Sequence, residues 1–365
     1  MSRVDAFLEL VVKQNGSDLH LVASNPPRVR LNGDTYSIKY RKLSTSETED
    51  LIFEIMSKAE IKTFKKESNL DFAYQIDGLA RFRVNAFKHL DGVGAVFRVI
   101  PSEIKTLNEL GLPPVIKNLA RQRKGLILVT GPTGSGKSTT LAAMIDYINS
   151  ERKGHIITIE DPIEFIHHNK CSLVSQREVG EHTKDFASAL HSALREDPDV
   201  ILVGELRDLE TIHLALTAAE MGILVMATLH TSSAASSIDR IINVFPPGEE
   251  AYVRTMLSTS LCGAISQQLL RTADARGRIA AIEIMVNNPA IANVIREGKS
   301  EQLDNIIQSG GMQGMQLMDT ALKRLLDAKL VTGDDAYMKA RNKTDFDRYR
   351  DTGEMSDESD KNPEE

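Results

Sequence analysis

The stretch Gly131-Pro-Thr-Gly-Ser-Gly136-Lys137-Ser138-Thr139 decides the fold of this chain. It matches the pattern G-x-x-x-x-G-K-[ST], in which glycine backbone N–H groups surround phosphate oxygens. Residues 126–129, just before it, are apolar and predict a buried parallel strand. Residues 141–148, just after it, carry apolar side chains at helical spacing. A strand, a glycine-rich loop and a helix in this order predict a phosphate-binding loop in an α/β domain.

The loop predicts binding of a nucleoside triphosphate, ATP or GTP. Its glycines let the N–H groups turn inward, and the following helix start favours negative charge. Lys137 is expected to reach the β- and γ-phosphates, and Ser138 to ligate Mg²⁺. The expected nucleotide contacts are Gly131, Thr133, Gly134, Ser135, Gly136, Lys137, Ser138 and Thr139.

Length and composition bound the class of protein. A chain of 365 residues with 41% hydrophobic residues suggests two or three domains with real cores. The two cysteines, Cys171 and Cys262, form no C-x-x-C pair, which excludes a cysteine zinc site and disfavours a disulfide framework. No secretory signal and no apolar run of 18 residues is present, so we expect a cytoplasmic protein without membrane insertion.

Charge is concentrated at one end. The net charge is −7, and residues 351–365 account for −6 of it, so the rest of the chain is near neutral. A near-neutral body disfavours nucleic acid as a partner, although a nucleic-acid translocase stays an alternative that salt-dependent DNA binding would support. The acidic terminus is expected to be disordered.

The pattern of apolar residues predicts two kinds of domain. Alternating strands and amphipathic helices predict a small α+β domain, and prolines mark the segment that follows it. Apolar runs at 126–129, 156–159, 200–203 and 223–229 then alternate with helices, which predicts a mainly parallel sheet. The expected organisation is an N-terminal domain at 1–100, a linker at 101–122, an ATPase core at 123–291, a helical part at 292–345 and an acidic tail at 346–365.

Acidic and polar residues follow the predicted parallel strands. An acidic cluster ending at Glu164 follows the run at 156–159, and Glu205 follows the run at 200–203. Ligands of open α/β sheets bind at the carboxyl ends of strands, so both are candidate catalytic carboxylates. His230 follows the run at 223–229 and is a candidate γ-phosphate sensor. His167 and His168, adjacent in sequence, are interpreted as surface residues.

Arginines are the remaining candidates. Arg81 and Arg83 alternate onto one face of a predicted strand, where two guanidinium groups suit a phosphate, with Arg98 nearby. Arg195 and Arg207 flank the strand before Glu205. Either they serve a neighbouring subunit's γ-phosphate, or they pair with Asp197 and Asp208.

Taken together, these segments resemble the secretion-type ATPase superfamily, closest to the PilT-type retraction ATPases of type IV pili. The resemblance covers about residues 1–345. The landmarks are Ser17-Asp-Leu-His-Leu21, Arg81-Phe-Arg-Val-Asn-Ala-Phe87, the phosphate loop, Thr158-Ile-Glu-Asp-Pro-Ile-Glu-Phe165, residues 194–208 and Ala227-Thr-Leu-His-Thr231.

The resemblance implies a PAS-like N-terminal domain, a RecA-like ATPase domain with C-terminal helices, and a ring-shaped homohexamer that uses ATP and Mg²⁺. Lys137 then binds phosphate, Glu205 holds Mg²⁺ through water, and Glu164 orients the attacking water. The same family pattern places Arg83, with Arg81 and Arg98, at the nucleotide.

Two positions depart from the family pattern. Ile223 stands where the family carries a histidine, and Ala292 replaces the first arginine of an A-I-R-N-L-I-R-E motif that reads Ala290-Ile-Ala-Asn-Val-Ile-Arg-Glu297. These two changes bear on the rate of ATP turnover and on its coupling to retraction. They do not affect the expected fold or ATP binding, since the phosphate loop is intact.

The expected function is a cytoplasmic motor at the inner-membrane face that retracts type IV pili by acting on a membrane platform protein. A second retraction ATPase is a possible further partner. The alternatives are an accessory paralogue that binds ATP but hydrolyses it weakly, and an ATPase of pilus assembly or type II secretion. The last class usually has a longer N-terminal region and a cysteine-rich zinc insert.

Overall fold

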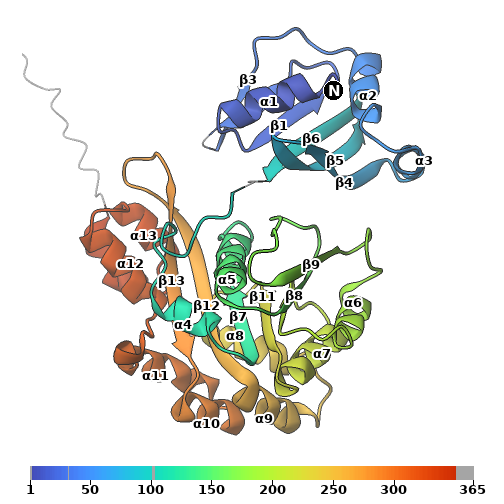
Figure 1. Cartoon of the computed structure of the whole chain (residues 1–365). Helices are drawn as coiled ribbons and strands as arrows, with labels where there is room; N and C mark the ends of the chain where they lie inside the picture. The colour runs from blue at the N-terminus through green and yellow to red at the C-terminus, as the bar shows by residue number, and fades with distance from the viewer. Residues whose placement is uncertain (1, 32, 101–102, 351–365) are drawn as a thin grey trace, which may run out of the picture. The chain divides into compact units, whose positions relative to one another are not determined.

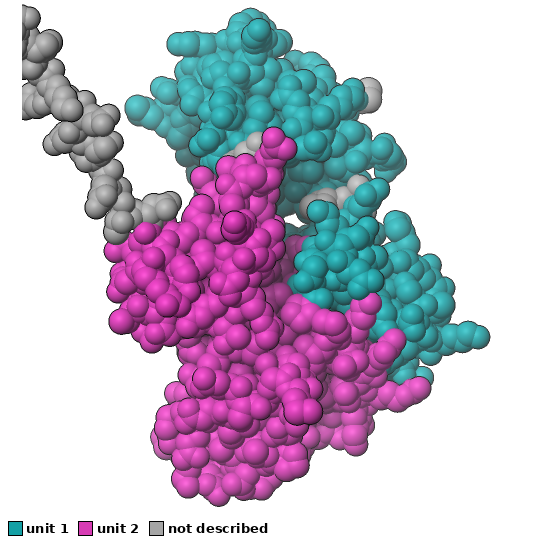
Figure 2. Space-filling model, turned by 90° about the vertical axis from the view of Figure 1, so that its left-hand side faces the viewer, with its two compact units in different colours: residues 1–112, 141–204 teal, residues 113–140, 205–365 magenta. Residues whose placement is uncertain are grey.

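A computed structural model describes residues 2–31, 33–100 and 103–350. The chain divides into two compact units, residues 1–112 with 141–204, and residues 113–140 with 205–365 (Figure 2).

The first 100 residues build an antiparallel sheet with helices. Its described strands have the order β3-β2-β1-β6-β5-β4. On β5 the buried side chains of Phe82, Val84 and Ala86 alternate with Arg81 and Arg83, as the sequence predicts. The elements are α1 (Asp5–Lys13), β1 (Asp18–Val22), β2 (Arg28–Leu31), β3 (Asp34–Ser37), α2 (Thr45–Phe53), α3 (Lys58–Glu67), β4 (Asn69–Ile76), β5 (Ala80–His89) and β6 (Gly92–Ile100).

The second sheet confirms the predicted α/β class. Its described strands have the order β13-β12-β7-β11-β10-β8-β9. The four predicted apolar runs lie in four of them, and β9, β12 and β13 are additions that the sequence pattern does not predict. The strands are β7 (Gly125–Thr130), β8 (His155–Glu160), β9 (Leu173–Glu178), β10 (Val200–Val203), β11 (Leu224–Leu229), β12 (Leu261–Arg271) and β13 (Arg278–Val286).

Pairing directions position the phosphate loop. In the second unit, β7 lies between β11 and β12 and is parallel to both, while β13 is antiparallel to β12. In the first unit, β8 is parallel to β10 and to β9. Every residue of β7 is buried, so its carboxyl end delivers the loop from the interior of the sheet.

Helices follow most strands. Helices α12 and α13 pack on β13 and β12, respectively, and α10 packs on α9 and α11 (Figure 1). Within the described ranges, no helix combines the length and apolar character needed to cross a membrane. The helices are α4 (Val115–Ala120), α5 (Lys137–Glu151), α6 (Phe186–Ala193), α7 (Leu209–Glu220), α8 (Ala234–Ile242), α9 (Glu250–Ser260), α10 (Pro289–Glu297), α11 (Leu303–Ser309), α12 (Met318–Asp327) and α13 (Gly333–Lys339).

Two predicted boundaries need correction. The predicted linker at 101–122 contains helix α4, and its residues 101–102 lie outside the described residues. The predicted tail at 346–365 begins too early, because Phe346 is fully buried in a cluster with Met318 and Leu322 of α12. Its remaining residues, 351–365, also lie outside the described part of the chain. The acidic residues are concentrated at 351–365, and the burial of Phe346 assigns residues 346–350 to the folded body.

Replacing Phe346 with alanine should loosen the cluster that anchors α12 and α13. Removing a buried phenylalanine side chain costs about 3 kcal/mol. We expect amide hydrogen exchange in α12 and α13 to accelerate by about a hundredfold. Met338→Ala on α13 is the matched control, since Met338 is 70% exposed. Equal exchange in the two variants would contradict the assignment of Phe346 to the folded body.

Candidate nucleotide-binding site

The phosphate loop has the backbone that a phosphate cradle requires. Gly131, Gly134 and Gly136 have φ values of +141°, +78° and +89°, which side chains other than glycine's rarely permit. The loop joins β7 to α5, as predicted. Lys137 Nζ donates to the carbonyl oxygens of Gly131 at 2.9 Å and Pro132 at 3.1 Å. The ammonium group therefore lies at the loop, which fits the binding of phosphate.

A residue that the sequence analysis missed also contacts the loop. Gln267 of β12 is 1% exposed, and its amide bonds both Ser135 and Thr140. Ser266, beside it, shares a hydrogen bond with the Thr130 hydroxyl. No local pattern identifies these residues, because their partners lie more than 120 positions earlier.

Glu205, Arg207 and His230 form one cluster in the second unit. Arg207 Nη2 lies 2.7 Å from Glu205 Oε2, and His230 Nε2 lies 3.4 Å from Glu205 Oε1. Burial tends to raise the pKa of Glu205, but hydrogen bonds and charge from Arg207 and His230 outweigh it and lower that pKa. The carboxylate is therefore ionised at neutral pH.

These groups fit a hard cation. Glu205 offers ionised carboxylate oxygens, and Ser138 offers a hydroxyl in the first turn of α5. Mg²⁺ prefers such oxygen ligands and usually retains waters.

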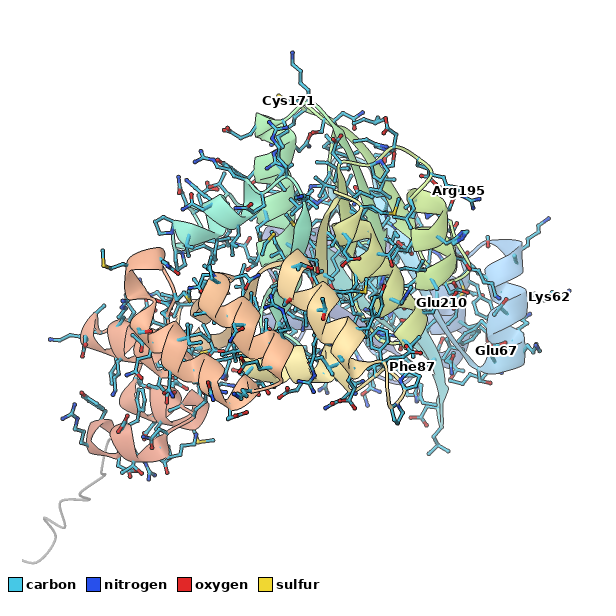
Figure 3. The ribbon with its side chains drawn as sticks, turned by 90° about the horizontal axis from the view of Figure 1, so that it is seen from below. Lys62, Glu67, Phe87, Cys171, Arg195 and Glu210 are labelled. Atoms are coloured by element: carbon cyan, nitrogen blue, oxygen red, sulfur yellow. The ribbon has the colours of Figure 1, made fainter. Side chains whose placement is uncertain are left out.

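Pairing of Arg207 with Asp208 is one of the two alternatives given above, and each of these residues has another partner in the structure. Arg207 pairs with Glu205, and Asp208 instead caps α7, where its Oδ1 accepts from Thr211 N at 2.9 Å. Arg195 lies just beyond α6 (Figure 3) and is exposed, with Nη2 3.3 Å from His191 Nδ1. It thus has a local partner other than the expected Asp197.

The last residue of β8, Glu160, and Glu164 in the segment that follows are two glutamates in different environments. Glu164 is exposed, and its backbone N–H donates weakly to Glu160 Oε2 at 3.5 Å. Burial raises the pKa of Glu160 to about 7, although hydrogen bonds from Thr158 Oγ1 and Gln176 Nε2 oppose the shift. Glu164 is thus the exposed carboxylate, and Glu160 is partly buried.

His167, interpreted above as a surface residue, is in fact buried. Its side chain is enclosed because the segment folds back against β9, with His167 N donating to Gln176 Oε1 at 2.7 Å. Burial lowers the pKa of His167 to about 4, so its imidazole is neutral near pH 7. His168 is exposed, as expected.

The N-terminal sheet gathers arginines into a cross-strand row. Arg83 lies opposite Arg98, Arg98 opposite Asp18, and Asp18 opposite Arg30. Arg98 Nε lies 3.0 Å from Asp18 Oδ1, and Arg83 Nε lies 3.8 Å from Asp71 Oδ1. Arg81 donates to Glu178 Oε2 at 3.0 Å. The predicted shared face of Arg81 and Arg83 extends to Arg98, whose side chain is 67% exposed.

A buried carboxylate lies behind the His230 segment. Glu283 of β13 is fully buried and accepts from Ala234 N, the first residue of α8, at 2.8 Å. It also accepts from Met318 N and Arg341 Nη1, each at 3.3 Å. Burial raises the pKa of Glu283, and these partners oppose the shift.

Comparison with known proteins places the chain in a family. The family described as type II/IV secretion system protein matches residues 1–334. This chain belongs to that family.

Its relatives include pilus motors. The type IV pilus retractation ATPase PilT of Pseudomonas aeruginosa is 53% identical over 338 residues, which span 93% of this chain and 98% of the relative. The type IV pilus ATPase PilU of the same species is 40% identical, over 97% of this chain and 92% of the relative. A crystal structure of the pilus retraction motor PilT with bound ADP matches with a TM-score of 0.88 and 44% identity, covering 95% of this chain and 99% of that one.

Ile223 and Ala292, the two departures from the family pattern, both lie outside the phosphate loop. Ile223 is 8% exposed, just before β11, so an apolar side chain packs there. Ala292 lies on α10, where Asn293 Nδ2 still bonds Glu297 Oε1 at 2.9 Å. Neither residue belongs to the phosphate loop.

The raised pKa of Glu160 predicts a pH-dependent stability. A carboxyl whose pKa rises from 4.5 to about 7 on folding binds more protons in the folded state between these values. The stabilisation that protonated Glu160 adds to the free energy of unfolding is therefore fully present below pH 4.5 and is lost as the pH rises toward 7. We expect the melting temperature of the nucleotide-free protein to fall over this range more steeply than that of Glu160→Gln. Melting temperatures that depend on pH in the same way in both proteins would contradict a raised pKa of Glu160.

Proposed function

We propose that this chain is an ATP-hydrolysing motor that powers retraction of type IV pili. The observation that carries the proposal is the match to a pilus retractation ATPase over nearly the whole of both chains. The intact phosphate loop and the Glu205 cluster support it. Identity to the retractation ATPase PilT, at 53%, exceeds identity to the type IV pilus ATPase PilU, at 40%.

The proposed roles follow from the chemistry of each group. Backbone N–H groups of residues 131–137 surround the phosphates, and Lys137 neutralises their charge. Ser138 and Glu205 hold Mg²⁺, the latter through water. When bound, Mg²⁺ withdraws charge from the phosphate oxygens. The exposed Glu164 orients the attacking water, and His230 senses the γ-phosphate beside Glu205.

The arginines complete the proposed site. Arg83, Arg81 and Arg98 present guanidinium groups from the N-terminal domain, and Arg195 and Arg207 serve the nucleotide or a neighbouring subunit. Arg207 also holds Glu205 in place through the 2.7 Å pair.

The proposed assembly is a homohexamer at the cytoplasmic face of the inner membrane, acting on a membrane platform protein, with a second retraction ATPase as a possible partner. Each subunit has a PAS-like domain at 1–100, an ATPase core at 123–291 and a helical part from 292, and helix α4 lies in the segment between the first two. Cycles of ATP binding and hydrolysis move these parts and deliver mechanical work.

Lys137→Ala should reduce ATP hydrolysis to background, because the phosphates lose their cation.

Glu164→Gln should lower kcat about a hundredfold by removing the group that orients water. Glu210→Gln, on the exposed first turn of α7, is the matched control and should leave the rate unchanged. ATP binding with equal, slow hydrolysis in the wild type and Glu164→Gln would point to the accessory paralogue.

Deleting the gene should abolish twitching while surface pili accumulate, because extension continues without retraction. Surface pili counted by microscopy and twitching zones check this outcome. Wild-type protein should restore both properties, and Lys137→Ala should not. Loss of surface pili would contradict retraction and indicate a role in pilus assembly.

A further inference from the structure

Gln267 braces the phosphate loop from the neighbouring strand. Its Nε2 donates to Ser135 O at 2.7 Å, and its Oε1 accepts from Thr140 Oγ1 at 2.9 Å. One side chain thus connects the middle of the loop to the first turn of α5. Gln267 and Thr140 are 1% and 2% exposed, so water does not compete for either bond.

The bond to Ser135 fixes a peptide plane. In a trans peptide, the C=O and the following N–H point in opposite directions. Holding Ser135 O toward β12 therefore turns the N–H of Gly136 away from β12. Gly136 is one of the loop glycines whose N–H groups form the phosphate cradle. The orientation of this donor depends on Gln267.

The register between β12 and β7 places the side-chain amide of Gln267 beside the Ser135–Gly136 peptide. Ser266 lies opposite Thr130, the last residue of β7, so Gln267 is the next residue beyond the paired segment. A Cβ at Gly136 would lie only 3.0 Å from Gln267 Nε2. The amide thus packs directly against the loop.

We propose that Gln267 is a positioning residue for nucleotide binding, which acts by orienting the Ser135–Gly136 peptide and the start of α5. The inference rests on the proposed binding of ATP and ADP at this loop. It assigns Gln267 no contact with nucleotide. Its effect on affinity passes through the backbone of the loop.

The test compares two neighbouring glutamines. Gln267→Met keeps the length of the side chain and removes both hydrogen bonds. Gln268→Met is the control, because Gln268 is only partly buried and bonds Lys339 O at 3.3 Å, away from the loop. We expect the Kd for ADP, measured with a fluorescent analogue, to rise about tenfold in Gln267→Met and to stay within about twofold in Gln268→Met.

Kinetics separate positioning from a purely structural role. Loop N–H groups bind phosphate in both the ground state and the transition state, so KM for ATP should rise with Kd while kcat falls less. A lower melting temperature of the free protein with unchanged Kd and KM would overturn the proposal and leave Gln267 a packing residue.

Thr140 supplies a second test should Gln267→Met fail to fold. Thr140→Val removes the hydroxyl that donates to Gln267 Oε1, and Thr140→Ser retains it. We expect Val to raise the Kd for ADP and Ser to preserve it, and equal Kd values for the two variants would overturn the inference. Wild-type protein that binds ADP but hydrolyses no ATP would contradict the proposed function alone, because the Gln267 comparison needs only binding.

Discussion

The close approach of the phosphate loop to strand β12 is the constraint on which the site depends. A Cβ at Gly131 would lie 2.3 Å from the carbonyl oxygen of Gln267, closer than such atoms ever approach. Any other residue at this position would push the loop away from β12, and α5 begins only six residues later. The glycine is therefore required by the backbone of a neighbouring strand as well as by its φ of +141°.

Two glutamates at the carboxyl ends of parallel strands show that identical side chains differ in protonation when their surroundings differ. Glu205 is ionised because Arg207 and His230 outweigh its burial. Burial raises the pKa of Glu160 to about 7, with no arginine among the groups that oppose the shift. An ionised carboxylate suits a cation, whereas a carboxyl that is half protonated near pH 7 is a poor cation ligand. This contrast favours Glu205 for Mg²⁺ and leaves Glu160 to order the segment that carries Glu164.

The sequence predicts those parts of the fold whose signals are local. Strands β7, β8, β10 and β11 are buried apolar runs, and the phosphate loop has a fixed spacing. Strand β12 escapes prediction because Ser266, Gln267 and Gln268 interrupt its apolar character. Ser266 and Gln267 are buried because Thr130 of β7 and Ser135 of the loop supply distant hydrogen-bond partners. The partner of Arg207, the burial of His167 and the burial of Phe346 escape for the same reason, since each depends on contacts that only the folded chain creates.

The same strand pair joins the nucleotide site to the C-terminal helices. Glu283 lies opposite Ser266 on β13, so it is the cross-strand neighbour of the residue that bonds Thr130. Its carboxylate accepts from the first N–H of α8, four residues after His230, and from the first N–H of α12. Leaving a buried hydrogen-bonding group without its partner typically costs about 1 to 3 kcal/mol. Displacing α8 from α12 would break one of these hydrogen bonds, so Glu283 connects the segment after His230 to α12 through β13.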